Sequence, residues 1–138
     1  MRSGAAITAA LCVELWAMPV VAQVPPEQDY VLHCSGCHRP DGSGAPDEVP
    51  SLVGLDRFLR LPEGRAYLIR APGVAQAPVT DERLAALMNW VLVEFGGAGV
   101  SPAYTAAEVK KWRALPLRDP TELRARLLAG PEVAAEVR

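Results

Sequence analysis

This chain of 138 residues contains the run Cys34-Ser35-Gly36-Cys37-His38, whose cysteines and histidine at this spacing suit only a few kinds of site. Its pattern, Cys-x-x-Cys-His, is the attachment signature of c-type haem. On a helical turn, residues three and four apart share a face, so both cysteines point at one edge of a ligand and the histidine lies under its ring plane. We therefore expect Cys34 and Cys37 to form thioethers with the two vinyl groups of one covalently attached haem. We expect His38 to bind the iron through Nε2.

Other uses of the same side chains give different expectations. A disulfide between Cys34 and Cys37 fits an oxidising compartment. A thioredoxin-like redox pair needs a βαβ pattern around it, and the sequence shows none. A zinc site made of His33, Cys34, Cys37 and His38 would place four ligands within six residues, with no second cluster along the chain. The haem signature is the most specific of these interpretations.

The first 22 residues have the pattern of an export signal. Arg2 gives a positive start, a mostly apolar run covers residues 5–21, and the small residues ending at Ala22 fit a cleavage site. Glu14 interrupts the apolar run, which argues against a stable membrane span. We expect cleavage of this signal and a periplasmic protein. An uncleaved N-terminal helix is the alternative.

The composition agrees with a small domain that surrounds a cofactor. The chain has 2 Phe, 3 Trp and 3 Tyr, and one of these aromatics, Trp16, lies in the predicted signal. Few large side chains remain to fill a core, and a flat apolar cofactor would supply the missing volume. The formal charge of −2 gives no basic surplus for a phosphate backbone, so we expect no nucleic-acid binding.

Three segments between residues 25 and 95 follow a pattern known from other proteins. Tyr30 is an aromatic on the predicted first helix, residues 39–44 read Arg-Pro-Asp-Gly-Ser-Gly, and residues 49–54 read Val-Pro-Ser-Leu-Val-Gly. They resemble the helix aromatic, the glycine-rich turn after the histidine and the Pro-x-Leu-x-Gly segment of the small single-haem cytochrome c family. The resemblance implies an all-α, cytochrome c-like helical domain around one covalent haem.

The resemblance also implies roles for individual residues. In that family the carbonyl of the proline that corresponds to Pro50 accepts a hydrogen bond from the ligand histidine, which would hold the tautomer of His38. Leu52 of the same segment is expected to contact the haem, and Phe58 and Leu59 to form walls of its pocket. The haem propionates are expected to meet Tyr67 or one of four arginines, Arg57, Arg60, Arg65 and Arg70.

The sixth iron ligand is left open by the sequence. In the family it is normally a methionine from the loop before the last helix, but here that loop, residues 71–78, has no methionine. Met88, within the following helix, is the candidate, and Lys110, Lys111, water or an empty position are alternatives. A bound methionine keeps the coordination constant and raises the potential, which suits electron transfer. An empty position would permit small-ligand binding or peroxidase-like chemistry.

Helical patterns and turn signals divide the rest of the chain. A signal (residues 1–22), a cytochrome c domain (23–97) and a C-terminal helical extension (98–138) are expected. Thr80 and Thr105 have the features of helix N-caps, the second with Glu108 in a capping box. Trp90 is expected to pack near Tyr30. Helices are predicted over residues 27–38, 64–70, 80–95, 105–115 and 120–129.

These features predict a periplasmic electron-transfer protein with one haem, not an enzyme. The implied partners are redox proteins such as a periplasmic dehydrogenase or a terminal oxidase. Residues 74–78 and 87–90 resemble proteobacterial cytochromes of the methylamine-utilisation type, which implies an amine or alcohol dehydrogenase as donor. The alternatives are a haem-based ligand sensor or peroxidase-like protein, and a subunit fixed to a dehydrogenase through the extension.

Overall fold

The computed structural model describes residues 24–97 and 102–129, and this part of the chain is all-α, as predicted. The predicted signal, residues 1–22, lies outside the described residues. None of the described helices is long and apolar enough to cross a lipid bilayer. The elements are α1 (Pro26–His33), α2 (Ser35–His38), the 3-10 helix η1 (Leu55–Arg60), α3 (Gly64–Arg70), α4 (Asp81–Glu94), α5 (Ala106–Arg113) and α6 (Thr121–Ala129).

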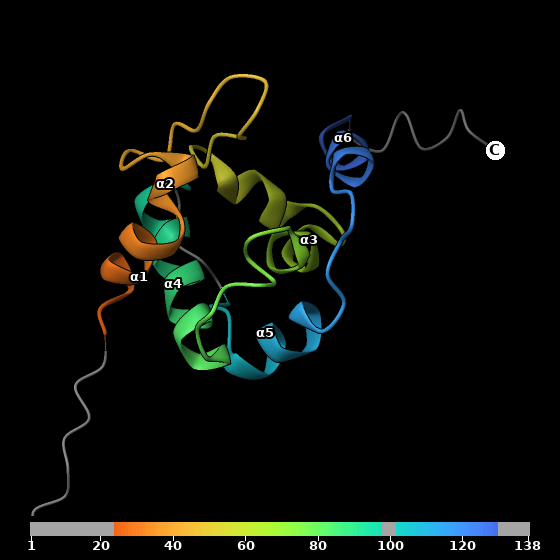
Figure 1. Ribbon diagram of the computed structural model, residues 1–138. Helices are drawn as coiled ribbons and strands as arrows, with labels where there is room; N and C mark the ends of the chain where they lie inside the picture. The colour runs from red at the N-terminus through yellow and green to blue at the C-terminus, as the bar shows by residue number, and fades with distance from the viewer. Residues whose placement is uncertain (1–23, 98–101, 130–138) are drawn as a thin grey trace, which may run out of the picture.

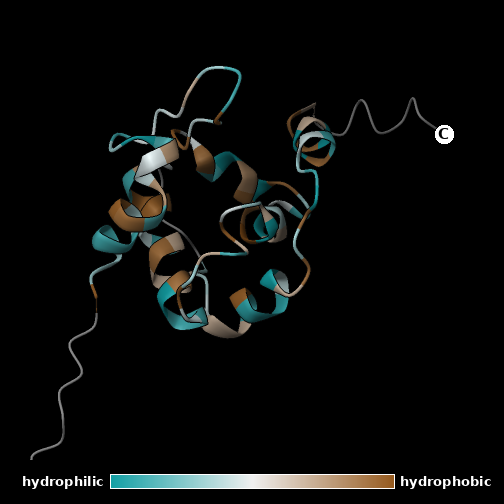
Figure 2. Cartoon of the chain, viewed as in Figure 1, coloured by the Kyte–Doolittle hydropathy of each residue, from teal (hydrophilic) through white to brown (hydrophobic). Residues whose placement is uncertain are grey.

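The helices are arranged around a common centre (Figure 1). Helix α1 packs on α4, α5 packs on both α4 and α3, and α6 lies beside α3. Hydrophobic residues gather where α1 and α4 meet (Figure 2). The centre of the molecule is therefore enclosed by segments from both ends of the described chain.

Helix α4 is the longest element, and its sequence explains its start and its buried face. The Thr80 hydroxyl accepts a 3.3 Å hydrogen bond from the Arg83 backbone N–H, which confirms the predicted N-cap. Asp81 and Glu82 follow in the first turn, where acidic side chains interact favourably with the helix dipole. The apolar side chains at helical spacing are buried: Leu84, Leu87, Met88, Val91 and Leu92.

An aromatic cluster joins α1 to α4. Tyr30 is only 2% exposed, and its ring centre lies 5.3 Å from that of Trp90 and 5.1 Å from that of Phe95. The Tyr30 hydroxyl donates a 2.6 Å hydrogen bond to the Arg39 carbonyl. The predicted contact between Tyr30 and Trp90 is confirmed, and it fixes the helix that leads into the cysteine motif.

The predicted helix over residues 27–38 is divided in two. Cys34 leaves the helical conformation, with φ −125° and ψ −41°. The backbone hydrogen bonds still run through it, because the Cys34 N–H donates to Tyr30 and the His38 N–H donates to the Cys34 carbonyl, both at 2.9 Å. The change in direction at Cys34 separates α1 from α2, which carries Cys37 and His38.

The C-terminal extension packs closely on the rest of the protein. Asn89 makes two hydrogen bonds to the Tyr104 backbone, at 2.8 and 3.0 Å, and the Tyr104 hydroxyl donates to the Arg65 carbonyl. Thr105 caps α5 by accepting from the Glu108 N–H at 3.2 Å. In a full capping box the Glu108 side chain would also accept a hydrogen bond from the Thr105 backbone N–H. That bond is not formed, because the Glu108 carboxylate binds Arg65 with both oxygens instead.

Candidate cofactor site

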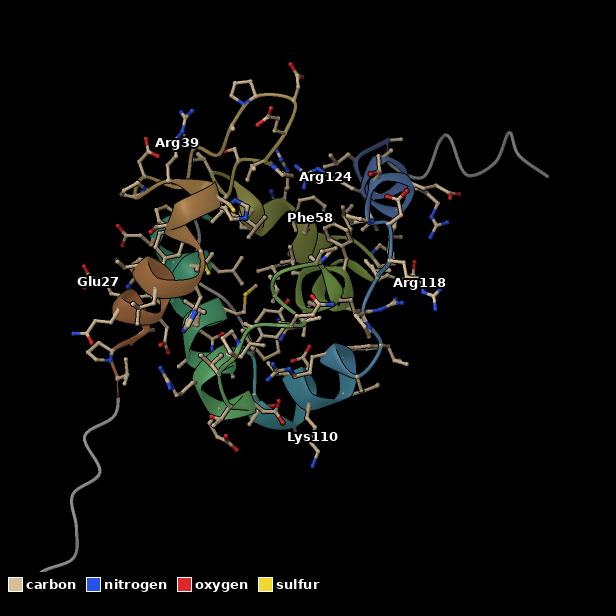
Figure 3. The ribbon with its side chains drawn as sticks, viewed as in Figure 1. Glu27, Arg39, Phe58, Lys110, Arg118 and Arg124 are labelled. Carbon is tan, nitrogen blue, oxygen red and sulfur yellow. The ribbon has the colours of Figure 1, made fainter. Side chains whose placement is uncertain are left out.

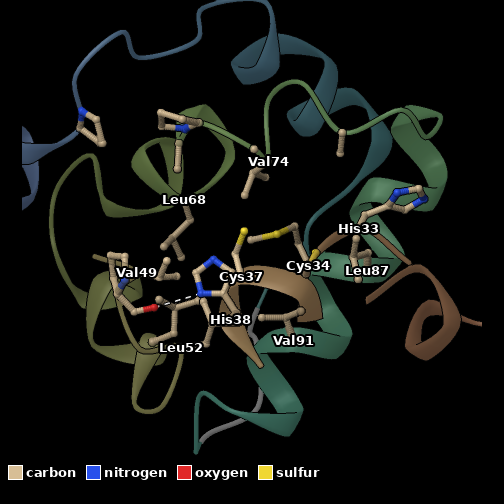
Figure 4. A pocket seen from close by; sticks show the side chains of 18 of the residues that line it. His33, Cys34, Cys37, His38, Val49, Leu52, Leu68, Val74, Leu87 and Val91 are labelled. Carbon is tan, nitrogen blue, oxygen red and sulfur yellow. Dashed lines mark hydrogen bonds between the residues drawn. The ribbon is translucent and has the colours of Figure 1, made fainter. Parts of the chain in front are cut away.

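An apolar pocket of about 370 Å³ lies among the helices. This volume is within the range of sites that bind small organic molecules and cofactors. One side is formed by the cysteine motif and the segment around Pro50, and the other by α3, the loop of residues 71–78 and α4. Apolar side chains on that second side include Leu68, Val74, Leu87 and Val91 (Figure 4).

The three residues of the haem signature all line this pocket. Cys34 is half-buried and Cys37 is exposed, and their thiols are free, so the disulfide interpretation is not supported. The pKa of Cys34 is raised to about 11, mainly by burial and in smaller measure by the nearby Asp29 and Cys37. Figure 4 shows the Cys37 side chain beside the His38 ring. Two thiols and an imidazole therefore face one cavity.

His38 is held by a single hydrogen bond to the backbone. Its Nδ1 lies 3.0 Å from the carbonyl oxygen of Pro50 (Figure 4). A carbonyl can only accept, so Nδ1 carries the proton and Nε2 is the free nitrogen of the neutral ring. Burial lowers the pKa of His38, and the hydrogen bond to Pro50 offsets part of this effect. The ring is thus in the form that binds a metal ion.

The turn after His38 brings Pro50 back to it. The Gly44 N–H donates to the His38 carbonyl at 3.0 Å, and the Leu52 N–H donates to the Gly42 carbonyl at 2.8 Å. Gly42 has φ +70°, and a side-chain carbon there would lie 2.8 Å from the Phe95 ring, so only glycine fits. The glycine-rich turn therefore sets the spacing between the histidine and the Pro50 carbonyl.

The predicted candidate for the sixth ligand, Met88, lines the pocket and is 5% exposed. The loop of residues 71–78 offers Val74 and Ala77 to the pocket, while its Gln76 side chain is turned back to accept from the Gly73 N–H at 3.0 Å. Lys110 and Lys111, the other named candidates, lie on α5 and do not line it. Among the described residues that line the pocket from α3, the loop of residues 71–78 and α4, Met88 is the one that carries a sulfur atom.

Leu52 and Tyr67, which are expected to contact the haem, line the pocket, and two neighbouring residues that are expected to form its walls do not. Phe58 and Leu59 do not line it, because the turn of η1 directs Leu55 to the pocket instead. Phe58 is fully buried on the far side of Tyr67, with ring centres 5.1 Å apart.

None of the four arginines expected to meet the propionates lines the pocket. Arg65 is bound to Glu108, Arg60 pairs with Asp56, and Arg70 donates to the Leu115 carbonyl. Arg57 lies over the Phe58 ring, with its guanidinium carbon 5.5 Å from the ring centre. The arginine that does line the pocket is Arg124, on α6, which the sequence interpretation did not single out.

A second residue missed by sequence reasoning is Arg113, on α5. Its guanidinium donates to the backbone carbonyls of Ala75, Ala77 and Val79, at 3.3, 2.7 and 2.9 Å, and to the Asp81 carboxylate at 3.0 Å. These acceptors lie in or next to the loop that forms one wall of the pocket. The extension therefore fixes the shape of that wall.

Comparison of the chain with known protein families and with characterised proteins finds no match. Within residues 24–97 and 102–129, no three His, Cys, Asp or Glu side chains converge to hold a metal ion, so the four-ligand zinc site of residues 33–38 is not formed. The geometry of the pocket is thus the basis for assigning a function.

Proposed function

We propose that the protein carries one covalently attached haem c and transfers electrons in the periplasm. Cys34 and Cys37 would hold the porphyrin through its vinyl groups, and His38 would bind the iron. When bound, haem iron supplies one-electron oxidation and reduction. The partners would be redox proteins such as a periplasmic dehydrogenase or a terminal oxidase.

The observation that supports this proposal is the bond between His38 and Pro50 inside the pocket that both cysteines share. It leaves Nε2 of His38 free and fixes the direction of the ring. A disulfide or a redox dithiol would have no need of an oriented imidazole beside a cavity of this volume. The residues present therefore fit a flat, iron-containing, largely apolar group.

The surrounding residues suit electron transfer in other ways. The pocket is lined mainly by apolar side chains, which would limit the access of water to a bound cofactor and so the reorganisation that accompanies a change of iron charge. The Cys37 end of the pocket is at the surface, since Cys37 is exposed while Cys34 is half-buried. One edge of the cofactor would therefore lie close enough to a docked partner for an electron to pass.

The test is pyridine haemochrome analysis of the purified exported protein, with two histidine variants as a matched pair. We expect one covalent haem per chain in the wild type and in His33→Ala. His38→Ala should lose the native absorption spectrum of a histidine-ligated haem, recorded before pyridine is added, and Cys34→Ser with Cys37→Ser should lose covalent attachment. A wild-type protein without covalent haem would refute the proposal.

A second candidate function rests on the loop of residues 71–78, which presents no coordinating side chain to the pocket. If Met88 only packs, the sixth position is open, and the protein is a small-ligand sensor or has peroxidase-like activity. Rapid CO binding to the reduced protein would favour this function. A methionine-to-iron charge-transfer band at the red end of the visible spectrum, lost in Met88→Leu, would favour electron transfer.

A further inference from the structure

The pocket has one arginine at its edge, and it comes from the C-terminal extension. Among the described residues that line the pocket, Arg124 is the only arginine or lysine. It also lines a second, more open hollow formed by residues 43–51. Its side chain therefore lies where the enclosed pocket meets the surface. The other titratable groups at the pocket, apart from the cysteines and Tyr30 and Tyr67, are His33, His38 and Glu48.

Arg124 is held in place by an aromatic ring. Its guanidinium carbon lies 5.3 Å from the centre of the Phe58 ring (Figure 3), a distance that gives a cation–π interaction. Phe58 is fully buried and stacks on Tyr67, which lines the pocket. Phe58 thus acts as a support that sets the position of the Arg124 charge relative to the cavity.

The charge of Arg124 is not neutralised by a carboxylate of the described chain. Arg65, Arg83 and Arg113 each have an Asp or Glu partner within 4 Å. No such pair is formed by Arg124 within residues 24–97 and 102–129, although Glu48 also borders the pocket. A half-buried guanidinium beside an apolar cavity favours an occupant with a flat apolar body and an anionic edge.

We propose that Arg124 binds a carboxylate of the pocket's occupant, which, on the proposed function, is a propionate of haem. Haem carries both propionates on the edge away from its vinyl groups, so an anchor for them is expected from a segment other than the cysteine motif, and Arg124 comes from α6. The planar guanidinium binds a carboxylate through two parallel hydrogen bonds, which a lysine does not reproduce. The extension is then part of the cofactor site.

The experiment compares Arg124→Gln with Arg126→Gln in the full-length exported protein. Arg126 is the matched control, because it lies on the same helix, pairs with Glu63 at 3.7 Å, has a side chain 57% exposed and does not line the pocket. Resonance Raman spectra report hydrogen bonding of the propionates through their bending bands, and spectroelectrochemistry gives the midpoint potential.

In Arg124→Gln we expect the propionate bands to shift and the midpoint potential to fall, since loss of a nearby positive charge favours the oxidised iron. Arg126→Gln should leave both at their wild-type values. Arg124→Lys, which keeps the charge, should retain the potential better than the propionate bands. If Arg124→Gln does not fold, the comparison is made with Arg124→Lys instead.

Unchanged propionate bands in both Arg124 variants, with covalent haem present, would overturn the inference and leave the proposed function intact. They would assign Arg124 to an ion pair with Glu48 or to surface stability. Absence of covalent haem from the wild-type protein would refute the proposed function itself. The two failures are therefore distinguishable by the haem content of the wild type.

Discussion

Arg113 on α5 donates a 2.7 Å hydrogen bond to the carbonyl oxygen of Ala77, and the same guanidinium reaches Val79 and Asp81. One side chain of the extension thus satisfies several acceptors of the loop that walls the pocket. Backbone carbonyls in such a loop have no partner from regular secondary structure, so the guanidinium donates the hydrogen bonds that a sheet or a helix turn would otherwise supply.

We expect Arg113→Met to destabilise the protein by about 2–4 kcal/mol, because several hydrogen bonds to a charged group are lost together. Urea unfolding of the haem-loaded protein measures the change. Lys110→Met, an exposed substitution on the same helix, is the control and should stay close to the wild type. Equal stability of the two variants would show that the loop holds its shape without Arg113.

The pair Arg65 and Glu108 should contribute measurably to holding the extension. Its two contacts are 2.9 and 2.7 Å, and both side chains are about three-quarters buried, at 23% and 25% exposed. A double-mutant cycle with Arg65→Met and Glu108→Gln should give a coupling energy of about 1 kcal/mol that decreases with added salt. A coupling near zero at low salt would contradict this assignment.

Replacement of Pro50 by alanine should be mild, because the acceptor for His38 is a backbone carbonyl that every residue supplies. We expect Pro50→Ala to keep covalent haem and the wild-type spectrum. The free energy of unfolding should fall by about 0.4–1 kcal/mol, since the unfolded chain gains freedom. A changed spectrum would mean that the proline ring, not only its carbonyl, positions the histidine.

The chain without haem should be unable to hold this fold. An apolar cavity of about 370 Å³ left unfilled would remove packing contacts from the side chains that line it, at a cost that rises with the cavity volume. Circular dichroism of Cys34→Ser/Cys37→Ser, purified free of haem, should show reduced helix and no cooperative unfolding. A cooperative transition like that of the holoprotein would contradict a cofactor-filled pocket.

Local signals predicted the helices well. The pattern of residues 64–70 gave the bounds of α3, and Thr80 caps α4 as its hydroxyl and the following acidic residues indicate. The contact of His38 with Pro50 was implied by a resemblance in the segments around each residue. In these cases the interactions that determine the local structure lie within a few residues of one another, or within a motif whose spacing fixes its geometry.

The wrong and missing predictions concern contacts between distant segments. Phe58 is apolar and near the motif, but the direction of a side chain on a short 3-10 turn depends on what packs against it, here Tyr67 and Arg124. Arg113 and Arg124 lie in helices whose sequences resemble any exposed amphipathic segment. Nothing local distinguishes them from the surface arginines around them.

The long separations along the chain between contacting segments have a consequence for the rate of folding. Arg65 meets Glu108 across 43 residues, Arg113 meets Ala75 across 38, and Arg83 meets Asp29 across 54. Contacts that close such large loops slow folding, because the entropy of closure precedes any gain. The walls of the cavity are therefore completed by contacts between distant segments. A large planar group fastened at the cysteines would be enclosed only as these segments come together.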